Sequence, residues 1–341
     1  MMLLSLGRQI ATDCQPLHGR GLANIALPFY LMRPCCILGP MPLSFPTVHF
    51  PGPGVEIFPL WPVLLMLVVS MFTSTAGVSG AFLLMPFQVS VLGYTGLGVT
   101  PTNHLFNVVA IPSGVYRYVR EGRMVWPLTF ITLVATIPGV LLGSHVRMRS
   151  LADPVSFKLF MGLVLLAIGS RMVFKLLVKG APKPPAPDQF EVRVTRFDAL
   201  RLEYEFEGEV HGLSVPVLFV ITAVIGVVGG AYGVGGGAFI APILVSVFRL
   251  PVHTIAGAAL AGTCLTSFVG VVYFAVAATV LGQPDLSPDW LLGGLFGLGG
   301  LVGMYVGARL QRRLPTRLIE TFLAFIVTVI ALRYVGGHFW P

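Results

Sequence analysis

The chain has 341 residues, of which 55% are hydrophobic and only 11% carry a charge, against about a quarter charged in a typical soluble domain. So few charged residues cannot cover the water-facing surface of soluble domains of this total length. The composition therefore excludes a soluble protein and predicts a polytopic membrane protein. The net charge of +8 comes from cations scattered between apolar segments, which indicates positive-inside topology rather than nucleic-acid binding. The four cysteines form no C-x-x-C pair, so neither a zinc site nor a disulfide framework is indicated.

The N-terminal segment differs from the rest of the chain. Its first 40 residues mix weakly hydrophobic stretches with proline, glycine and cysteine, and no compact apolar core ends in a signal-peptide cleavage site. We therefore expect residues 1–55 to be an N-terminal extension outside the membrane fold. It would be either a disordered tail or an upstream extension of the reading frame.

Apolar segments follow that are long enough to cross a hydrocarbon core of ~30 Å. Six are unbroken: 99–119, 125–146, 157–178, 254–281, 289–308 and 318–335. Two others are interrupted by small residues, 58–92 at 75–80 and 214–248 at the glycines between 229 and 237. Membrane helices tolerate such breaks where neighbouring helices satisfy the backbone.

A polar linker, residues 179–212, separates the two apolar halves and contains seven of the fourteen acids. It opens with four prolines between 182 and 187, which predict a stiff, extended stretch. Apolar and polar residues then alternate from 190 to 206, which predicts a small β-hairpin that turns near 197–199. A plain solvated linker is the alternative.

The two apolar halves, residues 56–178 and 213–341, repeat each other. At an offset of 156, 77–80 falls on 233–236, and the Val-Ser-Val at 89–91 falls on the one at 245–247. At an offset of 164, Trp126 falls on Trp290 and the glycine pair 139/143 on 303/307. Two ungapped blocks joined by one loop insertion predict an internal repeat, which is typical of secondary transporters.

Charge predicts how the repeats are oriented. The loop 117–123 contains three arginines, whereas its repeat partner 282–288 contains no Lys or Arg, so the two loops are expected on opposite sides. The linker, with five Lys/Arg, is then cytoplasmic. Three cations, Arg147, Arg149 and Lys158, are placed on the external side, which is an exception to the positive-inside rule. Segment 214–248 must start and end in the cytoplasm, which predicts a broken re-entrant hairpin, mirrored by 58–92. The predicted fold is all-α, with two inverted repeats of one re-entrant hairpin and three full crossings each.

Several motifs resemble one known family. They are the run GVGGGAFIAP at 233–242, the Gly262-Thr263 pair, the Gly303-x-x-x-Gly307 helix, the run GVSGAFLLMP at 77–86 and Thr102-Asn103-His104. Together they resemble the TauE/SafE sulfite exporter family over about residues 56–335. The resemblance implies a permease for small sulfur-containing or organic anions such as sulfite or sulfonates. Ser79 and Ala81 stand where the second repeat has Gly235 and Gly237, so the substrate stays open.

The small-residue breaks are the first candidate binding site. A break near the midplane leaves backbone N–H groups and positive partial charge at half-helix N-termini, which suit an anion. The alternative is close packing of helices through small residues. The candidate residues at the breaks are Gly77, Ser79, Gly80, Gly233, Gly235, Gly236 and Gly237.

Polar residues inside apolar segments are the second candidates, because amides in a bilayer need a partner or a polar cavity. Asn103 and Asn107 lie one turn apart on one helix face, and Thr263 is the repeat partner of Asn107. The alternative is hydrogen bonding between helices. His104 is a weaker candidate, as the carrier of a coupling proton.

No paired carboxylates, nucleophile–base pair or metal-ligand spacing is found, so the sequence predicts no enzyme, no metal site and no cofactor. We expect a secondary active transporter in the cell membrane, the inner membrane in a Gram-negative cell. Its partners would be the lipid bilayer, a small anionic substrate and protons as the coupling ion, with no nucleic acid and with a homodimer left open. A non-transporting membrane scaffold or assembly factor, and an anion channel, are the alternatives.

Overall fold

A computed structural model describes residues 47–75, 78–120, 122, 124–177, 193–206, 208–236, 239–240, 243–244, 252–310 and 316–339. The chain divides into two compact units, 1–44 and 45–341. The first unit, and with it most of the expected N-terminal extension, lies outside the described residues. The description that follows concerns the second unit.

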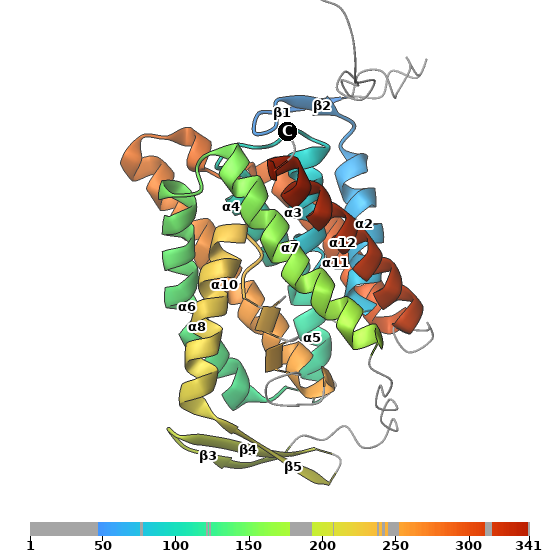
Figure 1. Cartoon of the computed structure of the whole chain (residues 1–341), viewed down its shortest axis with the longest axis vertical. Helices are drawn as coiled ribbons and strands as arrows, with labels where there is room; N and C mark the ends of the chain where they lie inside the picture. Colours follow the sequence, from blue (N-terminus) through green and yellow to red (C-terminus); the bar gives the residue numbers. More distant parts are fainter. Residues whose placement is uncertain are drawn as a thin grey trace, which may run out of the picture. The chain divides into compact units, whose positions relative to one another are not determined.

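A short antiparallel hairpin precedes helix α2 (Figure 1). Strands β1 (Val48–Phe50) and β2 (Val55–Ile57) pair with Phe50 opposite Val55. The Phe50 side chain is fully buried, and the N–H of Gly52 in the turn donates to Asp289 Oδ2 at 3.2 Å. Residues 48–57 are therefore part of the packed fold, although 48–55 fall inside the predicted extension.

The first half of the membrane region contains α2 (Leu60–Thr75), α3 (Ala81–Ser90), α4 (Val99–Ala110), α5 (Pro112–Arg120), α6 (Trp126–Arg149) and α7 (Pro154–Leu177). The predicted break between α2 and α3 falls at the small residues. The predicted single span 99–119 is instead divided into α4 and α5. Pro112 lacks an N–H and cannot continue the hydrogen-bond ladder of α4, so the helix is interrupted at Ile111.

The second half contains α8 (Val215–Tyr232), α10 (Val252–Leu281), the short 3-10 helix η2 (Pro284–Leu286), α11 (Trp290–Leu310) and α12 (Thr316–Phe339). Helix α8 ends at Gly233, which adopts a left-handed conformation (φ 85°) and donates its N–H to the carbonyl of Gly229. This is the usual glycine ending of a helix, and it places the predicted break at this point.

The predicted β-hairpin is confirmed, and the structure adds a third strand. Strands β3 (Arg193–Phe197), β4 (Arg201–Phe206) and β5 (Glu209–Ser214) form an antiparallel sheet that leads directly into α8. Leu202, Tyr204 and Phe206 are buried on one face of β4 and pack in a cluster with Leu218 of α8. A plain linker is thus wrong for residues 193–214.

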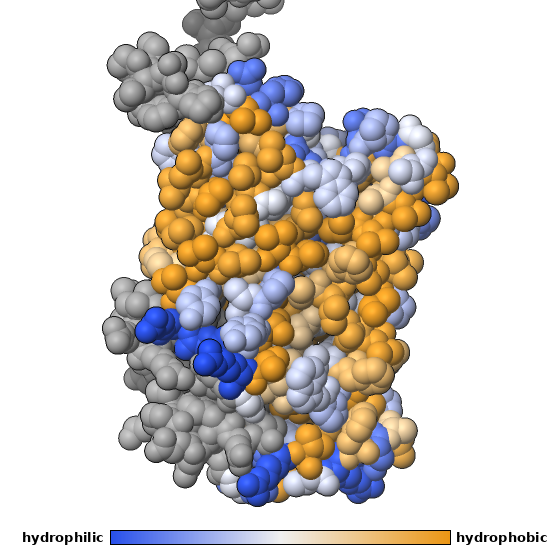
Figure 2. Space-filling model, turned by 180° about the vertical axis from the view of Figure 1, so that it is seen from behind, coloured by the Kyte–Doolittle hydropathy of each residue, from blue (hydrophilic) through white to orange (hydrophobic). Residues whose placement is uncertain are grey.

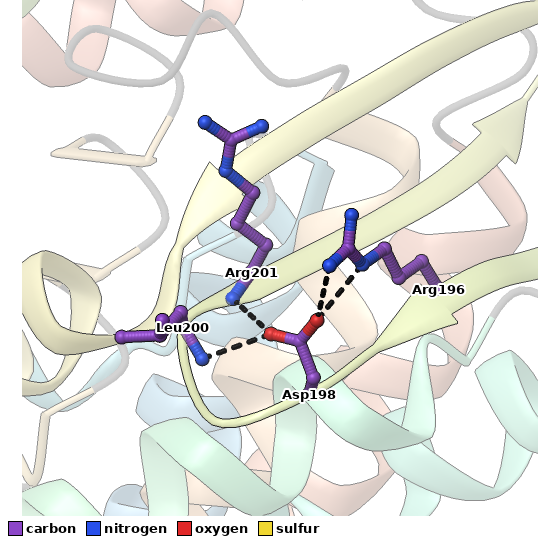
Figure 3. A network of polar contacts seen from close by, with 4 residues as sticks. All are labelled: Arg196, Asp198, Leu200 and Arg201. Carbon is purple, nitrogen blue, oxygen red and sulfur yellow. Dashed lines mark hydrogen bonds and ion pairs between the residues drawn. The ribbon is translucent and has the colours of Figure 1, made fainter.

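The turn between β3 and β4 is held by Asp198 (Figure 3). Its Oδ1 accepts the backbone N–H groups of Arg201 (2.8 Å) and Leu200 (3.0 Å), and its Oδ2 accepts Arg196 Nε at 2.8 Å. These bonds lower the pKa of the Asp198 carboxyl, and the two backbone N–H groups have the largest effect. The ionised Asp198 carboxylate therefore stabilises the hairpin fully at pH values above the ordinary aspartate pKa of ~3.9. This stabilisation is lost as the pH falls through the lowered pKa of the folded state.

Among the described residues, six helices are long and apolar enough to cross a membrane: Trp126–Arg149, Pro154–Phe174, Val215–Tyr232, Ile255–Leu281, Pro284–Gly307 and Thr321–His338. Leu60–Ser74 and Ala81–Ser90 are shorter apolar helices. The set differs from the predicted one, because the interrupted 99–119 is absent and α8, expected as half of a hairpin, is included. Figure 2 shows hydrophobic residues covering most of the visible face between polar residues near its ends, as a lipid-facing surface requires.

Glycines set the closest helix contacts. A Cβ atom at Gly139 or Gly143 of α6 would lie 2.2 Å or 2.1 Å from a carbonyl oxygen of α8. A Cβ atom at Gly303 or Gly307 of α11 would lie 2.3 Å or 2.1 Å from atoms of α2. These four glycines therefore serve close packing rather than ligand binding.

Candidate functional site

Helix α4 lies against both interrupted segments and carries the two asparagines. The Oδ1 of Asn107 accepts the Ser79 hydroxyl at 2.6 Å. Its Nδ2 donates to the carbonyl of Val234 at 3.0 Å and to Ser267 Oγ on α10 at 3.2 Å. One side chain therefore connects the first break, the second break and α10.

Asn103, one turn earlier, makes a parallel set of bonds. Its Nδ2 donates to the carbonyls of Ala81 (3.1 Å) and Gly233 (2.9 Å), and its Oδ1 accepts Gln88 Nε2 at 3.3 Å. Asn103, Asn107 and Gln88 are all fully buried. The two amides thus make buried hydrogen bonds that run between the two breaks.

Two glycines at the second break have left-handed backbones, Gly233 (φ 85°) and Gly235 (φ 66°). A Cβ atom at Gly235 would lie 2.9 Å from Ser267 Oγ and 3.1 Å from the Thr263 methyl, and one at Gly233 would lie 2.7 Å from the Thr100 carbonyl. Backbone conformation and close approach thus both require glycine here.

The remaining predicted residues are distributed unevenly. Gly80 lies beside Met66 and Ser70 of α2, and Gly236 lies beside Thr136 of α6. The Thr263 hydroxyl donates to the Ala259 carbonyl of its own helix at 2.7 Å, so only its methyl faces Gly235. Gly77 and Gly237 lie outside the described residues. The structure thus brings together Ser79, Asn103, Asn107, Gly233, Gly235 and Thr263.

Gln88 and Arg147 are buried polar residues that the sequence analysis did not select. Gln88 is an amide within an apolar stretch, and that signal could have identified it. Arg147 donates to Thr100 Oγ1 (3.1 Å), to the Gly96 carbonyl (3.5 Å) and to the Leu151 carbonyl, and it lies 3.7 Å from the Phe157 ring centroid. Because Arg147 is buried, it is not a water-facing anchor, which accounts for part of the predicted charge exception.

A groove of about 740 Å³ lies elsewhere, between α6 and α10. Apolar side chains line most of it, and His145, Arg149 and Tyr273 are among the polar ones, with His145 Nδ1 and Tyr273 Oη 3.2 Å apart. The groove contains none of the ten predicted site residues.

These features define a class of protein. The part of the chain that the structure describes has six apolar spans, a hydrophobic outer surface and buried amides at interrupted helices, which are the features of a multi-pass integral protein of the cell membrane. A family model described as sulfite exporter TauE/SafE matches residues 63–334, so the chain belongs to this family.

Curated relatives agree with the family. The chain is 22% identical to the probable membrane transporter protein YunE of Bacillus subtilis over 282 residues, covering 80% of this chain and 96% of the relative. It is 22% identical to the probable membrane transporter protein YjnA of Bacillus subtilis, covering 80% and 98%. It is 23% identical to the probable membrane transporter protein y4hK of Sinorhizobium fredii, covering 74% and 87%. No solved structure matches the chain. The chain is therefore a membrane transporter by family and relatives, which agrees with the expectation of a non-enzyme.

Proposed function

We propose that this transporter is a secondary active permease of small sulfur-containing anions such as sulfite or sulfonates. The observation that carries the proposal is the pair of buried amides, Asn103 and Asn107, which link the Ser79–Ala81 and Gly233–Val234 backbones. Because these bonds join two interrupted segments, a rearrangement of one segment changes the other. Such coupled breaks suit a carrier that alternates between two sides, whereas a scaffold needs neither break.

The proposed anion site lies at the two breaks. Helix α3 begins there, with the Ala81 N–H 3.3 Å from Ser79 Oγ, so the positive end of its dipole adjoins the buried amides. The N–H groups of Gly233, Val234 and Gly235 donate to the Gly229 carbonyl, and that of Val78 donates to the Thr73 carbonyl. The backbone at 77–80 and 233–237 would therefore supply N–H donors by exchanging these partners for the anion, so a buried Lys or Arg is not needed as a ligand. Asn103 and Asn107 would exchange carbonyl partners for the anion, and the Thr263 methyl would form part of the wall.

We also propose that the halves are inverted repeats, and the glycine contacts support this. Gly139 and Gly143 of α6 approach the carbonyls of Ala223 and Val227 of α8. Gly303 and Gly307, 164 residues later, approach the carbonyls of Leu67 and Met71, 156 residues before those two. Each half thus contributes one glycine helix and one partner helix to two equivalent contacts, with the repeat offsets of the sequence.

The two ends of α10 support opposite sides for the equivalent loops. A Cβ atom at Gly257, in the second turn of α10, would lie 2.6 Å from Met124 Sδ, just before α6. The last turn of α10 leads into η2, so Met124 and η2 lie at opposite ends of this helix. The 30 residues of α10 extend ~45 Å at 1.5 Å per residue, which exceeds a hydrocarbon core.

The proposed topology predicts a cytoplasmic β3–β5 sheet and an external loop 282–288. Single cysteines at Leu200 and Asp285, both exposed, would be introduced after the four native cysteines are replaced. In intact cells, an impermeant maleimide should label position 285 and not 200, and permeabilised cells should show both. Labelling of 200 alone would reverse the orientation, and labelling of both in intact cells would contradict inverted repeats.

The direct test of function is flux into proteoliposomes of purified protein. We expect saturable uptake of at least one of sulfite, sulfoacetate and methanesulfonate, with an increase when a proton gradient is imposed. Empty liposomes are the control. Non-saturating flux would favour an anion channel. Absence of flux for all of these anions, with protein that remains folded, would favour a non-transporting scaffold and contradict the proposal.

A further inference from the structure

His104 stands between Asn103 and Asn107 in the sequence of α4 and is fully buried. Neither of its ring nitrogens makes a hydrogen bond of good geometry within the described part of the chain, but the Gly230 carbonyl lies close enough to accept one ring N–H. A neutral imidazole carries one N–H donor, and leaving such a donor unpaired in the interior costs free energy. Because the Gly230 carbonyl can accept that one N–H, the second ring nitrogen is the one left without a partner among the described residues.

The imidazole of α4 lies against α10 and α8. On α10, a Cβ atom at Gly270 would lie 2.8 Å from His104 Nε2, one turn beyond Ser267, which bonds Asn107. On α8, Gly230 lies three residues before the Gly233 break. His104 thus adjoins both the second break and the asparagine network.

Helix α6 contributes a second unpartnered group. Val140 of α6 contacts Gly230, and Arg147 of α6 bonds Thr100 of α4. Ser144 lies between them on the same helix face, so it faces this junction. Its hydroxyl is buried and, among the described residues, has no hydrogen-bond partner.

Within the described ranges, few charged or titratable groups lie near the junction. Arg147 of α6 is bonded to Thr100, the Tyr232 hydroxyl of α8 donates to the Phe82 carbonyl, and Tyr273 of α10 pairs with His145. On the opposite face of α4, Asp289 accepts the backbone N–H groups of Gly52 and Leu292. Helices α3, α4, α6, α8 and α10 contain no Asp or Glu. A protonated His104 would therefore have no carboxylate partner on these helices.

We propose that His104 binds a proton together with the substrate anion, and that its imidazolium N–H groups and the Ser144 hydroxyl hold the anion at this junction. The inference deepens the proposed function and rests on it. In the empty protein the imidazole stays neutral, because the buried cation would have no counter-charge on the helices around it. The anion supplies that charge, so anion and proton each raise the affinity for the other. The imidazolium returns the proton to water when the anion leaves.

The test measures binding of methanesulfonate and sulfoacetate to the purified full chain between about pH 5.5 and 8, a range that includes the ordinary histidine pKa of ~6.5. The sulfonate group stays ionised throughout this range, and methanesulfonate carries no other titrating group. In the wild type, the dissociation constant should rise up to about tenfold per pH unit above the pKa of the empty site. His104→Gln keeps a side-chain N–H donor but cannot take up a proton, so its affinity should be independent of pH. His145→Gln, a histidine change in the groove away from the site, should keep the wild-type pH dependence.

A second measurement does not depend on the variants. Addition of methanesulfonate to weakly buffered wild-type protein should take up about one proton per bound anion at pH values above the site pKa. Wild-type binding whose pH dependence persists in His104→Gln, or binding without proton uptake over the whole range, would overturn this inference and leave the anion permease intact. If the wild type neither binds nor transports any of the sulfonates or sulfite, the proposed function fails and this inference with it.

Discussion

Gly235→Val is expected to abolish anion flux and to reduce the yield of folded protein. Gly235 has a φ of 66°, a left-handed conformation that costs an L-residue ~1–2 kcal/mol and a β-branched one more. Its added Cβ would lie 2.9 Å from Ser267 Oγ and 3.1 Å from the Thr263 methyl. Such overpacking typically costs a further ~1–3 kcal/mol. The sum is a large part of a stability that is commonly ~5–15 kcal/mol.

The effect on function should exceed the effect on stability. The valine side chain would press on Ser267, which bonds Asn107, so it would disturb the junction of α10 with the second break. The measurements are flux in proteoliposomes and the thermal midpoint of the detergent-purified protein. Gly294→Val is the matched control, because a Cβ at this helical glycine of α11 meets nothing within 4 Å. Normal flux in Gly235→Val would show that the second break is not part of the transport site.

Local sequence signals identify the membrane class, the polar hairpin and the end of α8. Each depends on residues that are close in the chain, such as the alternation in 190–206 or the glycines after Tyr232. The interruption at Ile111 is not predicted when 99–119 is treated as one apolar run, although Pro112 is a signal for a helix break. The third strand, β5, is not predicted because its pairing partner, β4, already completes a hairpin with β3.

The candidate site is harder to predict because its bonds are long-range. The one-turn spacing correctly places Asn103 and Asn107 on one face, but their acceptors lie more than 120 residues away at Gly233 and Val234. Thr263 is a candidate by its place in the repeat, yet its hydroxyl bonds its own helix. Serine and threonine in helices commonly bond the carbonyl four residues back, so position alone does not show which way a hydroxyl points.

Asn107→Ala should impair transport strongly while Thr263→Val should not. The alanine change removes three buried hydrogen bonds and leaves the Ser79 hydroxyl, the Val234 carbonyl and Ser267 Oγ without that partner. Each buried polar group left unsatisfied costs ~1–3 kcal/mol. The break segments would therefore lose their common anchor, and we expect flux at low substrate concentration to fall at least about tenfold, equivalent to ~1.4 kcal/mol.

Thr263→Val is a matched control at the repeat-equivalent position, since it keeps the side-chain shape and removes only a hydroxyl bonded within α10. Its flux should stay within about twofold of the wild type, because the Ala259 carbonyl can keep its helical partner. Ser79→Ala tests whether the loss of flux in Asn107→Ala depends on the bond between Asn107 and Ser79. Because Ser79 and Asn107 share one short bond, the double variant Ser79→Ala/Asn107→Ala should lose less than the sum of the single losses. Equal flux in Asn107→Ala and Thr263→Val, measured on correctly folded protein, would show that the buried amides serve assembly alone and that the anion binds elsewhere.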